Sequence, residues 1–312
     1  MNAPASSLAQ IPPIPCCKEA TLTVAVVICT RNRPGMLREC LRGVALQDSR
    51  PDQVLVVDNT EGNKETEEAA RQFGARYTIE PIQGLSRARN RGLAECDSDI
   101  VAFLDDDAIP APDWLGLLLA PFADEETGAT TGKVITPESR TKDQQEEIPR
   151  SLSRDKPQWF EIATFGGLGL GSNMALRKRA CTSPRLFDER LGRGAPFEIG
   201  EENYAFACLI EAGYSVVYLP TAVVFHPSLS RDTLEQEAQN SITYWLLLFT
   251  EFPGQRMNLV RFILRRLRHK PLDWPRDPQE AGEIVTSGWR VLFKAFLKGL
   301  WLFIRTPKEK GN

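Results

Sequence analysis

Residues 100–107 read IVAFLDDD, an apolar run that ends in three successive aspartates. Such a run is typical of a strand buried on both faces of a parallel sheet. Three neighbouring carboxylates repel one another, and beside a buried strand they are unfavourable without a partner. Mg²⁺ or Mn²⁺ would resolve the conflict, because these ions prefer oxygen ligands and share them with substrate phosphates. The structural alternative is an N-cap or an exposed turn, since a helix is expected near residues 112–114.

Strands and helices alternate on the amino-terminal side of this run. Further strands are expected over residues 23–29 (TVAVVIC), 54–57 and 77–79. Helices are expected after Pro34, whose ring suits a first helical turn, and over residues 64–73 and 85–95. This alternation predicts βαβ units, and therefore an α/β fold whose mostly parallel central sheet is flanked by helices.

Polar side chains follow these strands at their carboxyl ends, where ligands bind in such sheets. Residues 30–33 (TRNR), Asp58 and residues 105–107 should therefore converge on one crevice. Asp58 suits a nucleobase imide or a ribose hydroxyl, although aspartate is also common in turns. Asn90 stands at a helical position where it suits a nucleotide contact or a strand-end hydrogen bond.

Four arginines are expected near the same edge, and forked guanidinium groups suit a diphosphate. At least two of the four are expected to be ordinary surface residues. They are Arg31, Arg33, Arg87 and Arg89.

The second half of the chain offers an acidic pair and a histidine. Glu201 and Glu202 open an expected helix, where acids favour the dipole but a general base facing the crevice is the functional alternative. Strands are expected over residues 216–219 and 222–225. His226 ends the second of them and is either a metal ligand or structural. Residues 166–171 (GGLGLG) lack dinucleotide-loop spacing and are interpreted as a flexible wall near an acceptor, and residues 136–158 as a loop or flap.

These motifs together resemble a family 2 glycosyltransferase of the GT-A fold, in the family's order over roughly residues 22–230. The matching segments are VAVVICTRNRP, VLVVDNT, GLSRARNRGL, IVAFLDDDAIPAPDWL, GSNMALRK, GEENYAFACLIEAGYSVVYLP and VVFH. The resemblance implies an inverting, metal-dependent enzyme of the hexosyltransferase type. Its donor would be a UDP-, dTDP- or GDP-linked sugar, its cofactor Mn²⁺ or Mg²⁺, and its acceptor a hydroxyl of a glycan or of a lipid-linked compound.

Residue roles follow from the same resemblance. Asp105–Asp107 match the DXD element, with Asp107 and His226 on the metal and Glu202 as the general base. Glu201 is the second choice, because Glu stands at 202 where the family usually has Asp. The donor nucleotide is assigned to Thr30, Arg31, Asn32, Arg33, Asp58, Arg87, Asn90, Asp105 and Asp106.

Charge is distributed unevenly along the 312 residues. Residues 254–312 hold 13 Lys and Arg against 5 acids, a net charge of +8. Because the whole chain has a net charge of −3, the remaining residues carry −11. A basic segment on an acidic body suggests an anionic partner, a membrane surface rather than nucleic acid. We therefore divide the chain into a flexible tail (1–20), a GT-A catalytic domain (21–231) and a helical extension (232–312), with peripheral membrane contact through 258–305.

Composition and termini suggest the compartment. No signal sequence or spanning apolar run is visible, and the seven cysteines form no CxxC pair, which favours buried free thiols over a zinc site or a disulfide scaffold. We expect a cytoplasmic protein at the inner face of the membrane, acting in cell-surface glycan or glycolipid synthesis. Two alternatives stay open, a sugar-1-phosphate nucleotidyltransferase and a non-catalytic module that binds a nucleotide-sugar or a glycan.

Overall fold

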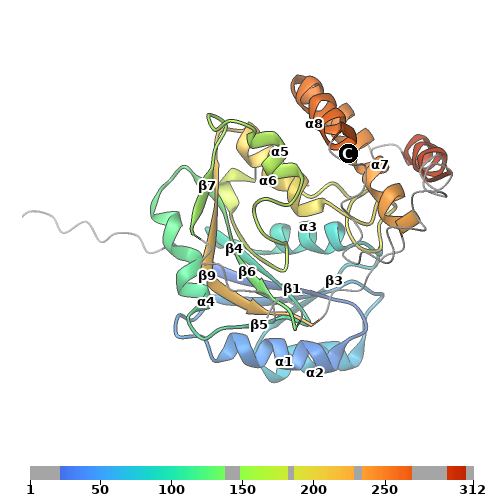
Figure 1. Cartoon of the computed structure of the whole chain (residues 1–312). Coiled ribbons are helices and arrows are strands. Elements are labelled where there is room, and N and C mark those ends of the chain that lie inside the picture. Colours follow the sequence, from blue (N-terminus) through green and yellow to red (C-terminus); the bar gives the residue numbers. More distant parts are fainter. Residues whose placement is uncertain (1–21, 138–147, 182–185, 228–233, 269–293, 307–312) are drawn as a thin grey trace, which may run out of the picture.

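The computed structural model describes residues 22–137, 148–181, 186–227, 234–268 and 294–306 (Figure 1). The expected tail (1–20), and parts of the expected flap and of the helical extension, lie outside the described residues. Among the described residues, no helix has the length and the apolar character needed to cross a bilayer.

The described residues form a nine-stranded sheet with the order β3-β2-β1-β4-β8-β6-β9-β5, and β7 pairs with β9. The strands are β1 (Val24–Thr30), β2 (Gln53–Asp58), β3 (Arg76–Ile79), β4 (Ile100–Asp105), β5 (Ile109–Pro110), β6 (Thr127–Ile135), β7 (Arg150–Leu152), β8 (Asn173–Arg177) and β9 (Ser215–Phe225).

The expected α/β fold is confirmed, but the sheet is mixed. Strands β3, β2, β1 and β4 are parallel, whereas β8 runs antiparallel to both β4 and β6, and β5 and β7 run antiparallel to β9. Strands β6 and β9 also pair in parallel, so the expected parallel arrangement holds for β1 to β4 and for this pair, and β8, β5 and β7 depart from it.

The structure differs from the predicted strands at two places. β7 lies within residues 136–158, which were expected to form a loop. The strand was not predictable because it has three residues, too few to show an alternation of apolar and polar side chains. The two strands expected at 216–219 and 222–225 are one strand, β9, whose pairing with β6 shifts register between Leu219 and Val223. Pro220 stands in that irregular stretch, where a residue without a backbone N–H is tolerated.

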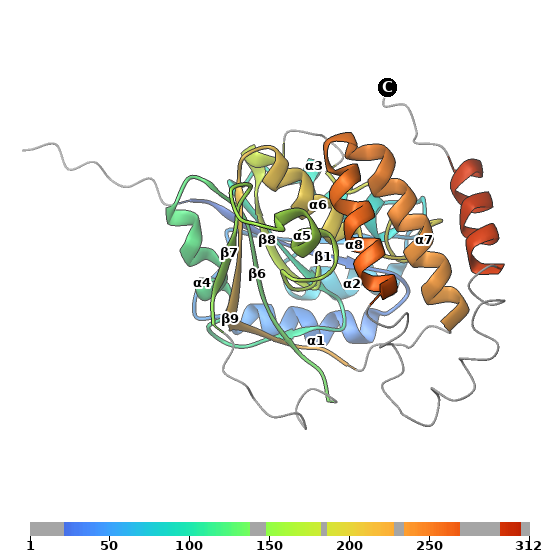
Figure 2. The same ribbon diagram turned by 45° about the horizontal axis from the view of Figure 1, so that its top comes forward.

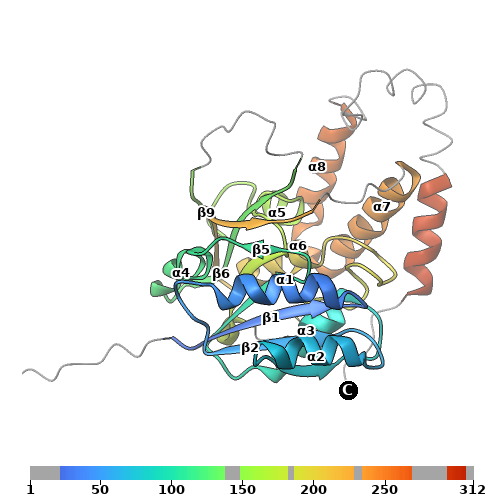
Figure 3. The same ribbon diagram turned by 90° about the horizontal axis from the view of Figure 1, so that it is seen from below.

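Helices cover both faces of the sheet (Figures 1 and 3). They are α1 (Pro34–Ala45), α2 (Lys64–Gln72), α3 (Leu85–Glu95), α4 (Trp114–Leu119), α5 (Trp159–Thr164), α6 (Glu201–Glu211), α7 (Leu234–Glu251) and α8 (Arg256–Arg268), with 3₁₀ turns over Ala120–Ala123, Lys178–Ala180 and Pro253–Gln255. A further helix spans residues 294–305.

Alternate residues of β1 feed two separate cores. Val26 and Ile28 pack with α1, α2 and α4, while Ala25 and Val27 pack with α3, α5 and α6. Gly92 lets α3 lie directly on β1, because a Cβ there would stand 2.6 Å from Val27. Buried residues of α7 join the second core, so the helical extension packs on the sheet domain.

Candidate functional site

The carboxyl ends of β1, β2 and β4 meet at one edge of the sheet. Thr30 pairs with Asp58 across β1 and β2, and Cys29 pairs with Asp105 across β1 and β4. Parallel register therefore brings the polar clusters that end these strands side by side, as the sequence predicted.

Asp105, Asp107 and His226 form a cluster that can hold a metal ion. One ligand atom from each lies within 4.8 Å of the others. The Nε2 of His226 lies 3.0 Å from Asp107 Oδ1 and 3.9 Å from Asp105 Oδ2. Two carboxylate oxygens and one imidazole nitrogen suit Mn²⁺ and also accept Mg²⁺. The residues present therefore fit a divalent cation.

His226 reaches this cluster from the far side of the sheet. Its backbone N–H donates to Ile135, and its Nδ1 lies 2.8 Å from the Pro227 carbonyl, which accepts from a protonated Nδ1 and leaves Nε2 to face the carboxylates. Hydrogen bonds to Asp105 and Asp107 raise the pKa of His226 to about 10. Burial opposes ionisation of Asp107, but the hydrogen bond and the charge of His226, together with the charge of Arg33, outweigh it and lower the pKa of that carboxyl. With its pKa of about 10 the imidazole is protonated at neutral pH, and it places a positive charge beside the two carboxylates.

Asp106 points away from the metal cluster. Its Oδ2 accepts a 2.6 Å hydrogen bond from the Thr30 hydroxyl, and its Oδ1 lies 2.7 Å from Arg33 Nη2. The side chain is completely buried, and burial raises its pKa to about 6. Asp106 and Thr30, both predicted to contact the nucleotide, therefore tie the ends of β1 and β4 to each other.

Asp58 is also buried, and its carboxylate accepts hydrogen bonds from three donors within the protein. It accepts hydrogen bonds from the Thr60 hydroxyl (2.8 Å), the Asn63 backbone N–H (2.9 Å) and the Tyr77 hydroxyl (2.7 Å). Both oxygens are thus engaged. The carboxylate shapes the loop after β2, where the sequence placed a nucleobase or ribose contact.

Asn59, the next residue, was not among the predicted site residues. Its amide donates to the carbonyls of Glu80 and Ile82 and accepts from Gly84 N–H, which fixes the entry to α3. Arg31 donates to the Asn59 carbonyl. The signal for this role was the Asp58–Asn59 pair at a strand end, where an amide commonly bonds the backbone.

The remaining predicted donor residues divide into two groups. Asn32 is exposed with a φ of +56°, and its amide oxygen lies 3.4 Å from Asn63 Nδ2. Arg33 is half-exposed and lies 2.8 Å from Asp107 of the metal cluster. Arg87 instead pairs with Glu189 at 2.6 Å. The amide of Asn90 both donates to and accepts from the Phe187 backbone, at 2.8 and 3.1 Å. Arg87 and Asn90 therefore brace the segment before α6.

Arg89 is the cation at the centre of the site, although it was expected only as one of four arginines near the edge. It is 2% exposed, and its two terminal nitrogens lie 2.9 Å from Glu201 Oε1 and 3.5 Å from Asp105 Oδ1. Gly171 leaves room for it, because a Cβ there would stand 2.7 Å from the guanidinium. A usable signal existed, since Arg89 stands four residues before Leu93 on the buried face of α3.

The two acids at the start of α6 have different surroundings. The carboxylate of Glu201 is held by Arg89 and packs against Gly192, which has a φ of +92°. Glu202 has no ion pair among the described residues. Burial and the neighbouring Glu201 raise its pKa to about 8, against the influence of Arg89. A carboxyl with this pKa can exchange a proton near neutral pH.

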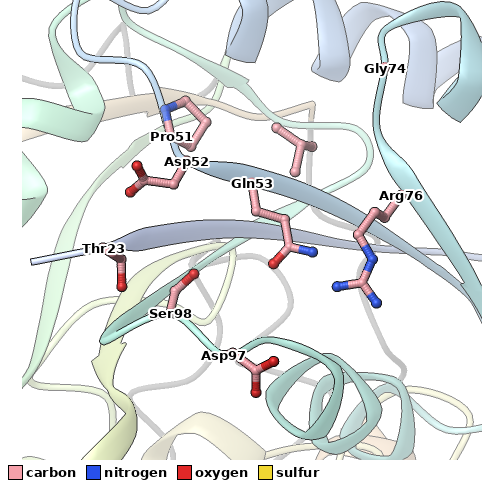
Figure 4. Close-up of a pocket in the computed structure, with 9 residues that line it drawn as sticks. Thr23, Pro51, Asp52, Gln53, Gly74, Arg76, Asp97 and Ser98 are labelled. Atoms are coloured by element: carbon pink, nitrogen blue, oxygen red, sulfur yellow. The ribbon is translucent and has the colours of Figure 1, made fainter.

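A separate hollow of about 700 Å³ lies at the opposite edge of the sheet, at the amino ends of the strands (Figure 4). Its polar lining includes Asp52, whose carboxylate accepts from Val24 N–H at 2.7 Å, and Arg76, which pairs with Glu95 at 3.3 Å. None of the predicted site residues lines this hollow.

Comparisons with known proteins identify the family of this chain. The model of the family described as glycosyl transferase family 2 matches residues 25–182. The succinoglycan biosynthesis protein ExoM of Rhizobium meliloti is 30% identical over 235 residues, which cover 66% of this chain and 67% of that protein. An N-acetylglucosaminyltransferase of the same organism is 25% identical over 219 residues, covering 64% of this chain. The chain spans 50% of the length of that relative.

The fold is also found among solved structures. A mannosyltransferase from Pyrobaculum calidifontis, solved in complex with GDP-Man and Mn²⁺, superimposes with a TM-score of 0.55 at 16% identity. The match covers 90% of this chain and 85% of that one, and the shared architecture is the GT-A fold. The match of the family model over residues 25–182, half of the chain, places the chain in glycosyl transferase family 2.

Proposed function

We propose that the protein is an inverting, metal-dependent glycosyltransferase that moves a sugar from a nucleotide-diphospho-sugar to a hydroxyl acceptor. The observation that carries the proposal is the convergence of the cluster Asp105, Asp107 and His226 with the acids at the start of α6, through Arg89. Family membership favours this reaction over nucleotidyl transfer. A titratable acid with a raised pKa beside a cation-binding cluster favours an enzyme over a binding module.

The metal would be held by Asp105, Asp107 and His226, as supported by the close approach of their ligand atoms. When bound, Mn²⁺ or Mg²⁺ supplies positive charge for the diphosphate that departs. Arg33, half-exposed beside Asp107, adds a guanidinium for the same group.

We assign the general base to Glu202. Its carboxylate takes the proton of the acceptor hydroxyl as the acceptor oxygen bonds to the anomeric carbon and the bond from that carbon to the diphosphate breaks. A single displacement of this kind inverts the anomeric configuration. Glu201 is engaged by Arg89, which favours a positioning role for it.

For the donor, we propose that Arg31, Asn32 and Arg33 contact the nucleotide directly, since these three side chains are exposed at the strand end. Thr30, Asp58 and Asp106 shape the surface beneath them through buried hydrogen bonds. Arg87 and Asn90 hold the neighbouring loop. Residues 21–231 would form this catalytic domain, with 232–312 as its helical extension.

We further propose that the acceptor is a lipid-linked compound or a cell-surface glycan, met at the cytoplasmic face of a membrane. Five described cysteines are free, which suits a reducing compartment. The cationic segment 258–305 would make the membrane contact.

The test is a thermal-shift screen of UDP-, dTDP- and GDP-sugars with and without Mn²⁺, followed by assays of donor hydrolysis. We expect one nucleotide class to raise the melting temperature only when Mn²⁺ is present. Hydrolysis should disappear in Glu202→Gln, which keeps the fold. Release of pyrophosphate from a sugar-1-phosphate and a nucleotide, without sugar transfer, would overturn the proposal.

A further inference from the structure

The helix over residues 294–305 packs against the protein with its small residues. Ala295 and Gly299 are buried, and a Cβ on Gly299 would stand 3.0 Å from the side chain of Ile242 on α7. Phe303 stacks on Phe197 with the ring centroids 6.1 Å apart. The helix is therefore seated on α7 at a fixed rotation about its axis.

The opposite face of this helix presents large apolar side chains to solvent. The exposed fractions are 45% for Phe296, 50% for Leu297, 55% for Trp301 and 69% for Ile304. A helix of a soluble protein normally buries its large apolar residues and exposes its polar ones. Here four large apolar side chains are exposed together, and a grouped apolar surface of this kind marks an interaction site.

The charged residues of this helix all have one sign. Residues 294–305 read KAFLKGLWLFIR, with three cations and no acid. The guanidinium of Arg305 lies over the ring of Trp301, 4.3 Å from its centroid. Helix α8, which reads RMNLVRFILRRLR, also has no acid. Helices α8, α7 and 294–305 lie side by side at one end of the molecule (Figure 2). Together they carry eight Lys and Arg against three acids, all three on α7, so this end is cationic on balance.

We propose that the outward face of residues 294–305 inserts into the interface of a membrane rich in anionic lipid. Aromatic and aliphatic side chains enter the boundary between headgroups and acyl chains, while Lys294, Lys298 and Arg305 meet the phosphates. A second copy of the chain is the less fitting occupant, because twofold pairing of this face brings the same cations toward one another. The inference deepens the membrane contact in the proposed function and is independent of the transfer chemistry.

The test is co-sedimentation of the full chain with two kinds of vesicle, one of phosphatidylcholine alone and one that also contains about 30% phosphatidylglycerol, an anionic lipid. We expect binding to the anionic vesicles, at least tenfold weaker binding to the neutral ones, and weakening by salt. The variant Phe296→Ser/Trp301→Ser/Ile304→Ser should lose at least tenfold in partitioning. The control is Ile82→Ser, which removes an apolar side chain that is 56% exposed in a different part of the fold. It should bind the anionic vesicles like the wild type.

A spectroscopic measurement assigns the contact to the helix. Brominated lipid should quench tryptophan emission in the wild-type chain, and Trp301→Phe, which keeps the apolar face, should bind equally and lose most of the quenching. Equal binding by the triple variant would overturn the proposal. A dimer that the triple variant makes monomeric, without vesicle binding by the wild type, would assign the face to a second copy instead. Donor hydrolysis in solution should be unchanged in the triple variant, so failure here is distinct from failure of the proposed function.

Discussion

Arg89 joins Asp105 at the end of β4 to Glu201 at the start of α6, at 3.5 and 2.9 Å. These two acids are 96 positions apart in the sequence, and one buried guanidinium fixes the distance between the metal cluster and the helix that carries Glu202. Its fork geometry suits two separate carboxylates, which a lysine ammonium does not match. The contact connects the two halves of the proposed site.

Replacing Arg89 with methionine should destabilise the protein, because it leaves a buried carboxylate without its partner. Loss of one member of a buried pair costs about 3–5 kcal/mol. Urea denaturation monitored by circular dichroism measures the change, and Glu201→Gln in the Arg89→Met background should recover part of it.

The matched control is Arg91→Met on the same helix. Arg91 makes an exposed i,i+4 pair with Glu95, so its loss should change stability by about 0.5 kcal/mol or less. Equal effects of the two substitutions would contradict a central role for Arg89.

Glu202→Gln should lower glycosyl transfer at least about 100-fold, because general-base catalysis contributes factors of that size. The pKa of Glu202 is raised to about 8, so the folded protein holds a proton there that the unfolded chain releases above about 4.5. Stability should therefore fall as the pH rises from about 4.5 to 8. The Gln variant should show a flatter profile in denaturation across that range.

Activity gives a second view of the same group. In the wild-type enzyme, kcat/KM should increase with pH toward about 8 as Glu202 loses its proton. Glu201→Gln, a neighbouring variant, should retain this limb but shift it to lower pH, because the charge of Glu201 contributes to the raised pKa of Glu202, and it should also lower stability. An unchanged profile in Glu202→Gln would assign the base elsewhere.

Asp107→Asn and His226→Asn should each remove the thermal stabilisation given by Mn²⁺. An ion at 100 times its Kd stabilises the native state by about 2.7 kcal/mol, which a melting curve detects readily. Asp113→Asn removes an exposed acid that does not belong to the cluster, and it should respond to Mn²⁺ like the wild type.

Thr30→Val should destabilise the protein while leaving the metal response intact. The hydroxyl donates to the buried carboxylate of Asp106 at 2.6 Å, and an unsatisfied buried acceptor costs about 1–3 kcal/mol. The Thr30→Ser variant keeps the donor and should lie close to the wild type in urea. Loss of donor binding with unchanged stability in Thr30→Val would instead support a direct nucleotide contact.

The order of strands and helices in the first hundred residues was predictable because apolar periodicity and the turn residues agree there. The α/β class and the clustering of residues 30–33, Asp58 and residues 105–107 followed from one rule, that parallel strands end at the same edge. The antiparallel strand β8 was not predictable in this way, since a strand buried on both faces reads alike in either direction.

The sequence by itself determined which residue types are present at the strand ends, and so the kind of chemistry the edge can support. Only the tertiary structure decided how those residues are used. Asp106 points to Thr30 rather than to the metal cluster, Arg89 becomes the buried link to Glu201, and residues 294–305 present Trp301 outward. Each outcome depends on contacts between segments far apart in the chain. The local sequence does not determine which distant side chain each residue contacts, because that partner is set by how the strands and helices pack.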